Sequence, residues 1–369
     1  MNAGVVAALI AAIASVVVAV TTAVLSYVSE RSRRVIQDNV IADQRAHDLR
    51  LAAIDNHLAE RRAEQDARRD YEYAARRRLY DTVAPLLFQL GELSEGALGR
   101  IRGLARTAAK GDLGPGKESW LSHEGYYFKS TLYRLLAPLA IGNLMRRQLT
   151  VIDLTLDQGM ATQYELIRQL AAALTDDQDF AAYGKSIDYA PDDSPSGHGD
   201  EERLPDRLRR QGAYSGWLEQ ALDGMIRFDV GIDAPRLINY GEFETIYEGD
   251  GDEAQSFMQL CYLFRDFHPG RHRVLWRVLV THSLLYQAVV DIQRAGSEPG
   301  LDASVRPIRQ PTEREQAALD WRPDDSDISD EEAVSEPLTV ARRYLGRELP
   351  HLTPAGWSST APPTGADGM

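Results

Sequence analysis

The sequence predicts a mainly α-helical protein that begins with a single transmembrane helix. Residues 5–28 are an unbroken run of apolar and small residues, and residues 30–80 contain no proline or glycine but many charges of both signs. Beyond them, apolar residues recur at steps of three and four, which is the period of an amphipathic helix. We divide the 369-residue chain into four parts: an anchor (1–29), a helical stalk (30–80), a helical bundle-like domain (81–296) and a disordered acidic tail (297–369).

The run 5–28 is long enough to cross a bilayer, because 24 helical residues rise about 36 Å and the hydrocarbon core is about 30 Å thick. The alternative, a cleaved signal peptide, has a shorter apolar core and a basic residue before it. Arg31, Arg33 and Arg34 follow the run directly. Since positive residues stay in the cytoplasm, we expect the N-terminus outside the cell membrane and the bulk of the chain inside.

Residues 30–80 predict an exposed helix that continues the span, since 12 basic and 10 acidic residues alternate along it. His47, Leu51, Ile54 and Leu58 have the 4-3-4 spacing of a coiled-coil seam, which polar residues then interrupt. A second stripe is mostly alanine (Ala42, Ala46, Leu49, Ala53). Two alternatives stay open, a solvated monomeric stalk and a weak homodimer, which small residues in the span could also support.

The first half of the domain shows three helical segments. The strongest stripe runs through Val83, Leu86, Leu90, Leu93, Ala97, Ile101 and Leu104. Residues 126–149 form an apolar segment that is too short between charges for a second span and contains Pro138, which predicts a core hairpin or a bent core helix. A third helix is expected at about 160–174.

The second half begins with an acidic stretch, in which we expect a flexible loop at about 186–206. Residues 213–228 and 235–247 are shorter pieces of uncertain type. Two helices, 253–267 and 271–294, flank a Pro-Gly turn and predict an antiparallel αα-hairpin. The last segment, 297–369, carries 14 acidic and 7 basic residues and predicts disorder, with helical islands at 312–319 and 336–345.

Composition excludes several classes of function. A net charge of -14 opposes nucleic-acid binding. The lone cysteine, Cys261, cannot form an internal disulfide or a thiolate zinc cluster. No common catalytic motif occurs, so we expect no cofactor. The excess of arginine over lysine is typical of a high-GC genome, as in many bacteria.

The sharpest motif is Gly111–Lys117, which matches the G-x-x-x-x-G-K pattern of a phosphate-binding loop. Glu118 stands where the magnesium-binding hydroxyl is needed, and Pro115 lacks an N–H within the cradle. A helical segment, rather than a strand, precedes the motif. These departures favour a plain loop between two helices.

Other polar groups suggest chemistry less strongly. Asp266, His268 and His272 surround the Pro-Gly turn and could bind a metal or exchange protons, although exposed residues beside a turn explain them as well. His282 lies on an apolar helix face and predicts a core histidine. The acidic run 248–253 lacks the register of an EF-hand.

The sequence therefore favours a binding protein, namely a membrane-anchored scaffold, adaptor or sensor for an unknown protein partner. Docking could use the aromatic residues between Phe257 and Trp276, which could equally be core. The alternative is a membrane-tethered enzyme or effector with its site at Asp266, His268 and His272.

Overall fold

The computed structural model describes residues 3–114, 120–121, 125–148, 156–176, 179–180, 212–228, 235–296, 307–319 and 337–357. Over these residues the protein is helical apart from one short pair of strands. The chain divides into two compact units, residues 1–74 and 75–369. The division falls close to the boundary that we expected between stalk and domain.

The first unit consists of one helical segment. It belongs to α1 (Ala3–Ala109), an unbroken helix. The apolar residues of its N-terminal part are exposed, and this part is long and apolar enough to cross a membrane. Among the described helices, α1 alone meets this criterion. The expected anchor and stalk therefore lie on one continuous helix.

The second unit begins with the C-terminal part of α1. The predicted apolar stripe is confirmed: Val83, Leu86, Leu90, Ala97, Ile101 and Leu104 are buried, and Leu93 packs against them. The helix ends where Gly111 and Gly114 adopt left-handed φ angles of 75° and 109°. Glycine tolerates these angles because it has no Cβ, so the chain can reverse direction there.

The next two helices form the centre of the domain. α2 (Tyr126–Gln148) continues through Pro138, so the hairpin alternative is wrong and the core-helix alternative holds. Nearly all of its residues from Phe128 to Met145 are buried. α3 (Gln158–Thr175) matches the predicted third helix, and the side chain of Asp157 caps it by accepting a hydrogen bond from the N–H of Met160.

The stretches of uncertain type form a small helix–strand–strand–helix unit. The elements are α6 (Ser215–Gly224), β1 (Ile226–Arg227), β2 (Arg236–Leu237) and α7 (Tyr240–Tyr247). The strands are antiparallel, with Ile226 opposite Leu237. Asn239 and Glu242 cap α7 reciprocally, which satisfies backbone N–H groups at its start. The expected flexible loop 186–206 lies outside the described residues.

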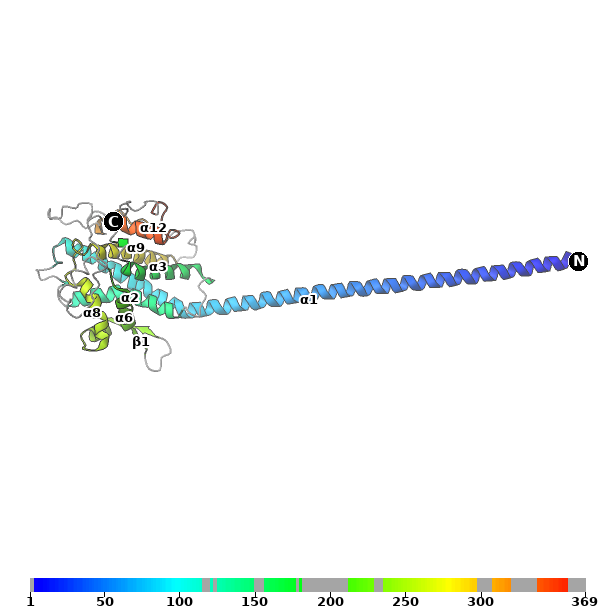
Figure 1. Ribbon diagram of the computed structural model, residues 1–369, viewed down its shortest axis with the longest axis horizontal. Helices are drawn as coiled ribbons and strands as arrows, with labels where there is room; N and C mark the ends of the chain where they lie inside the picture. Colours follow the sequence, from blue (N-terminus) through cyan, green and yellow to red (C-terminus); the bar gives the residue numbers. More distant parts are fainter. Residues whose placement is uncertain are drawn as a thin grey trace, which may run out of the picture. The chain divides into compact units, whose positions relative to one another are not determined.

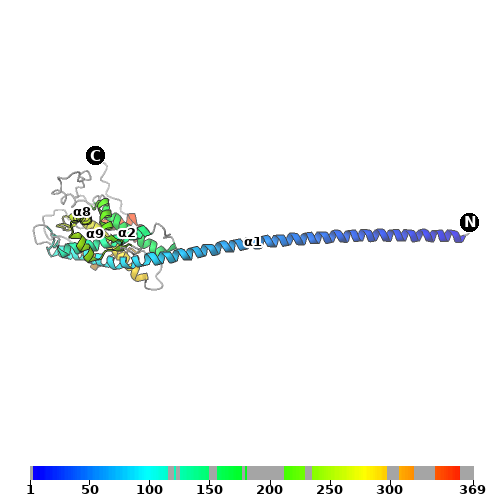
Figure 2. The same cartoon turned by 90° about the horizontal axis from the view of Figure 1, so that it is seen from below.

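The two later helices pack mainly on other elements, and not mainly on each other as the predicted hairpin required. α8 (Asp252–Phe264) and α9 (Arg273–Gly296) both form. However, α8 packs on α6 and α7, whereas α9 packs on α3 and α12 (Pro337–Glu348). α2 contacts members of both groups and so joins them (Figures 1 and 2).

Two segments of the expected tail belong to the core. α10 (Glu313–Leu319) and α12 match the predicted helical islands. Leu319 of α10 is buried, as are Val340, Tyr344 and Leu345 of α12. Residues 297–306, 320–336 and 358–369 lie outside the described residues. The folded domain therefore includes chain far beyond the expected boundary at residue 296.

Candidate functional site

A cavity of the described domain lies between α2, α3 and α6. Its volume is about 280 Å³, close to the lower end of the range for small-molecule sites, about 300–1,000 Å³. Its apolar lining comes from Leu139, Ile167, Ala171, Leu218 and Leu222. The cavity is therefore suited to the apolar body of a small ligand.

Three exposed charged side chains also line the cavity: Arg146, Arg168 and Glu219. Arg146 donates a hydrogen bond to the side-chain oxygen of Asn143 at 3.0 Å. Within the described part of the chain, neither arginine forms an ion pair with a carboxylate. The lining therefore carries two arginines outside any direct ion pair with a described carboxylate, together with one acid, Glu219.

A network of polar side chains joins α2 and α6 on one side of the cavity. Asn143 donates from its side-chain amide to Asp223 on α6 at 2.9 Å, and Arg147 forms an ion pair with the same carboxylate. The charge of Asp223 is thus balanced by Arg147, the neighbour of Arg146. This network joins α2 to α6 and fixes one wall of the cavity.

Close packing of α2 on α3 fixes the opposite wall. Gly142 lies where a Cβ atom would come within 2.1 Å of Cγ2 of Ile167. Only glycine permits this approach of the two helices without movement of the backbone. The sequence showed a glycine within an apolar run but not the side chain that it faces.

The histidine turn is built mainly from backbone hydrogen bonds. The N–H of His268 donates to Nδ1 of His272 at 3.1 Å, and the N–H of Gly270 donates to Nδ1 of His268 at 3.3 Å. Because a backbone N–H can only donate, both Nδ1 atoms are unprotonated and each neutral ring carries its proton on Nε2. Burial and the nearby charge of Arg271 lower the pKa of His268, which favours the same neutral state.

His272 and Asp266 are parts of the turn that precedes α9. His272 is buried beside the ring of Phe267, directly before the first residue of α9. Asp266 adopts a left-handed φ of 54° in the same turn. Among the described residues, no group of three or more His, Cys, Asp or Glu side chains is placed to hold a metal ion.

The glycine-rich loop and the histidine turn are neighbours. A Cβ atom on Gly114 would lie 3.5 Å from the ring of His268. The backbone of Leu121 accepts a hydrogen bond from the N–H of Asp266, which ties the far side of this loop to the same turn. Pro115, Lys117 and Glu118 lie outside the described residues.

Two further predictions concern single groups. His282 is a core histidine, as predicted: it is buried, and its Nε2 donates to the carbonyl oxygen of Leu170 at 2.8 Å. Burial lowers its pKa to about 4, so the ring is neutral. In the acidic run, Glu248 forms an ion pair with the mostly buried Lys129 of α2.

The aromatic residues proposed for docking are mainly core. Phe257, Phe264, Phe267 and Trp276 are all buried. Tyr262, the remaining Phe, Tyr or Trp residue between Phe257 and Trp276, is partly exposed. The expected aromatic docking face is therefore absent from the described surface of α8 and α9.

Sequence reasoning missed a polar cluster between α3 and α12. Asp176, which follows the last residue of α3, and Asp179 further along face Tyr344 and Arg347 of α12. Burial and the neighbouring carboxylate of Asp179 raise the pKa of Asp176 to about 6, while Arg347 lowers the pKa of Asp179. The two acids lie at the start of the acidic stretch, before the loop expected at about 186–206, and no local signal marked their partners.

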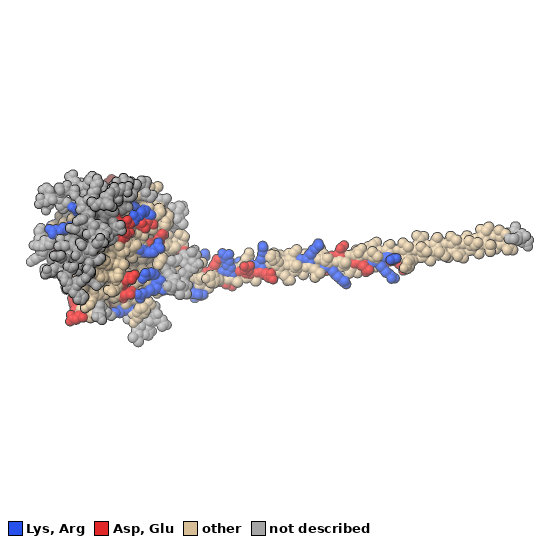
Figure 3. Space-filling model, in the orientation of Figure 1, with Lys and Arg blue, Asp and Glu red and all other residues tan. Residues whose placement is uncertain are grey.

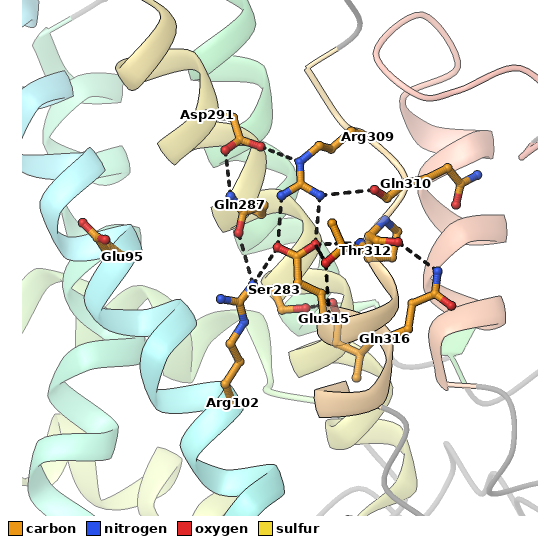
Figure 4. Close-up of polar contacts among 12 residues, drawn as sticks. Glu95, Arg102, Ser283, Gln287, Asp291, Arg309, Gln310, Thr312, Glu315 and Gln316 are labelled. Atoms are coloured by element: carbon orange, nitrogen blue, oxygen red, sulfur yellow. Dashed lines mark hydrogen bonds and ion pairs between the residues drawn. The ribbon is translucent and has the colours of Figure 1, made fainter.

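A second missed network holds α10 in place (Figure 4). Arg309 forms two hydrogen bonds with Glu315, at 2.9 and 3.0 Å, and a third with Asp291 of α9 at 3.0 Å. Arg102 of α1 donates to the same glutamate at 3.1 Å. The hydrogen bonds and charge of Arg309, together with hydrogen bonds from Thr312, lower the pKa of Glu315 to about 2, so it stays ionised. The network explains why 307–319 is ordered.

The sequence also did not indicate the role of Arg277. It is 1 % exposed and donates from Nη1 to the carbonyl oxygen of Phe180 at 2.7 Å. A buried guanidinium needs such partners because transfer of an unpaired charge from water is costly. Arg277 thereby links the N-terminal part of α9 to the chain just beyond α3.

Comparison of this chain with protein-family models, with curated proteins and with solved structures finds no match.

Proposed function

We propose that this protein is a single-span protein of the cell membrane that acts as a sensor, with its N-terminus outside and its helical domain in the cytoplasm. The domain takes a small amphiphilic anion into the cavity between α2, α3 and α6 and passes its presence to a protein partner. The observation that carries this proposal is the apolar cavity with Arg146 and Arg168 in its lining.

The exposed apolar segment of α1 supports the anchor. Its hydrophobic side chains, from Val5 to Val28, are all at least 39 % exposed. In water such a surface is unfavourable, whereas the hydrocarbon of a bilayer would cover it. Three arginines at 31, 33 and 34 follow it and support the cytoplasmic orientation of the domain.

The lining of the cavity indicates the class of ligand. Its apolar wall suits an aliphatic or aromatic body, and the two arginines suit one carboxylate or phosphate head. Glu219 in the same lining disfavours a ligand with several negative charges. The predicted ligand is therefore a small monoanion with an apolar tail.

Binding of octanoate to the full chain in lipid nanodiscs tests this proposal by isothermal titration. Octanol, which has the same tail without the charge, is the matched ligand control. We expect octanoate to bind, and the double variant Arg146→Gln, Arg168→Gln to weaken binding by about tenfold, as loss of a charge-assisted contact predicts.

Two further variants separate the cavity from other surfaces. Arg134→Gln removes an exposed arginine of α2 that does not line the cavity, and it should leave binding unchanged. Ala171→Leu adds apolar volume inside the cavity and should reduce binding. Equal binding of octanoate to all four proteins would contradict the proposal, as would equal binding of octanol and octanoate.

A further inference from the structure

We infer that residues 40–58 of α1 form a parallel, in-register coiled coil with a second copy of this chain. The inference rests on the proposed anchor, which sets the direction of the two helices. It goes beyond the sensor proposal, because it names the contacting face, the register and the charge pairs.

The first observation is an exposed apolar row. Val40, Leu51, Ile54 and Leu58 lie on one face of α1, and each is 44–54 % exposed. With Gln44 and His47 they follow the heptad spacing of a coiled-coil seam, at steps of four and three. Burial of this row against an identical row would remove apolar surface from water on both helices.

The second observation is where α1 makes its own ion pairs. Within the described part of the helix the pairs are Arg34–Glu30, Arg68–Glu72, Arg69–Asp66 and Arg77–Asp81. None falls between residues 35 and 65, although Figure 3 shows charges of both signs there. A polar single helix needs many such pairs to be stable by itself. The segment with the apolar row lacks them.

The charges beside the row complement those of a second copy. In a parallel coiled coil, each g position faces the e position five residues further along the partner helix. With Leu51 at position a, Arg50 is at g and Asp55 is at e, so they pair between the copies. His57 faces Arg62 at the following g–e position, and Glu64 faces Arg69 at the one after that, beyond the end of the segment. Asp43 facing Asp48 is the one repulsive acidic contact.

The anchor determines the orientation and the register. Two copies inserted in one membrane have the same direction, so an antiparallel arrangement is excluded. Their spans lie at the same depth, so equal residue numbers come side by side. Under these conditions the apolar rows face each other without any shift.

Cysteine crosslinking in membranes tests the face and the register. Gln44→Cys places a thiol in the seam without loss of an apolar residue, whereas Ala42→Cys places one on the alanine stripe, on the outer face. The native Cys261 is buried, and the unmodified chain controls for it. Under mild oxidation we expect Gln44→Cys to form a crosslinked dimer several-fold faster than Ala42→Cys.

Charge exchange in the Gln44→Cys background tests the pairing. Arg50→Asp and Asp55→Arg should each slow crosslinking, and the double exchange should restore it. Equal rates for the two cysteine positions, or no crosslink at Gln44→Cys, would overturn the inference, as would a double exchange that behaves like the sum of its single changes. The fraction of each variant in the membrane pellet is measured in parallel, so loss of the anchor is distinguished from loss of the seam.

Discussion

The side-chain amide of Gln169 on α3 donates a hydrogen bond to the hydroxyl oxygen of Tyr344 on α12, 2.8 Å away. Both residues are buried, and they are 175 positions apart in the chain. The ring of Tyr344 also packs on Phe180, with ring centroids 4.5 Å apart. This contact makes α12 a structural part of the domain.

Removal of the Tyr344 hydroxyl should destabilise the domain. In Tyr344→Phe the amide of Gln169 loses its buried acceptor, and we expect the free energy of unfolding to fall by about 1–2 kcal/mol. Tyr126→Phe is the control, because the ring of Tyr126 is 66 % exposed. Denaturant unfolding measures both; similar effects of the two changes would contradict the assigned role of the hydroxyl.

The pKa of Asp176 should make stability depend on pH. Asp179, Tyr344 and Arg347 face this carboxyl, and its pKa is raised from 3.8 to about 6. The folded state therefore holds the proton more tightly than the unfolded chain does. The stabilisation is complete below about pH 4 and is lost as the pH rises through 6.

Asp176→Asn tests this dependence. Between pH 4 and 7 the variant should gain about 1 kcal/mol relative to the unmodified chain, after allowance for solvent screening at a half-exposed group. The exposed Asp250→Asn is the control and should show no such trend. Parallel stability curves for Asp176→Asn and the unmodified chain would refute the prediction.

Gly142→Ala should lower stability because of steric overlap. The new methyl group would meet Ile167 at 2.1 Å, and relief of such overlap in a packed core costs about 1–3 kcal/mol. Gly99 is an exposed residue of α1, and no atom would lie close to the methyl group of an alanine there. Gly99→Ala is therefore the control. It should stabilise the protein by about 0.5–1 kcal/mol. Thermal unfolding measures both variants. A change in stability of the same sign for Gly142→Ala and Gly99→Ala would contradict the prediction.

Glu315 should hold α10 on the domain. Glu315→Ala leaves Arg309 and Arg102 without their shared carboxylate. We expect a loss of about 1–3 kcal/mol and faster proteolysis between residues 307 and 319. Glu313→Ala removes an exposed acid from the same helix and should have little effect. Unchanged proteolysis of Glu315→Ala would argue against this role of Glu315 in holding α10 on the domain.

Two substitutions at His272 separate a structural role from a catalytic one. His272→Asn keeps a side-chain acceptor directly before α9, where asparagine is a favourable cap, and His272→Ala does not. If the ring serves the turn, asparagine should retain most of the stability that alanine loses, with no effect on ligand binding. Equal loss of a cellular activity in both variants, with the fold intact, would instead favour the enzyme alternative at Asp266, His268 and His272.

The long-period features could be predicted from the sequence. The apolar run 5–28 and the stripe from Val83 to Leu104 each specify one helix, because spacing along the chain is enough to define a helix face. The islands at 312–319 and 336–345 were visible for the same reason. Hydrophobic spacing does not indicate which neighbouring element the apolar face of a helix packs against.

That choice of neighbour was decided by the tertiary structure. The Pro-Gly turn between α8 and α9 suggested a hairpin, but α9 packs on α3 and α12 and α8 packs on α6 and α7. The cavity requires Arg146 and Arg168 from different helices, and the α12 cluster joins Asp179 to Arg347 across 168 positions. Sequence by itself determined the apolar N-terminal segment and the helical elements, since these depend on neighbours within a few residues. The cavity and the inclusion of the C-terminal segment depend on side chains that only packing brings together.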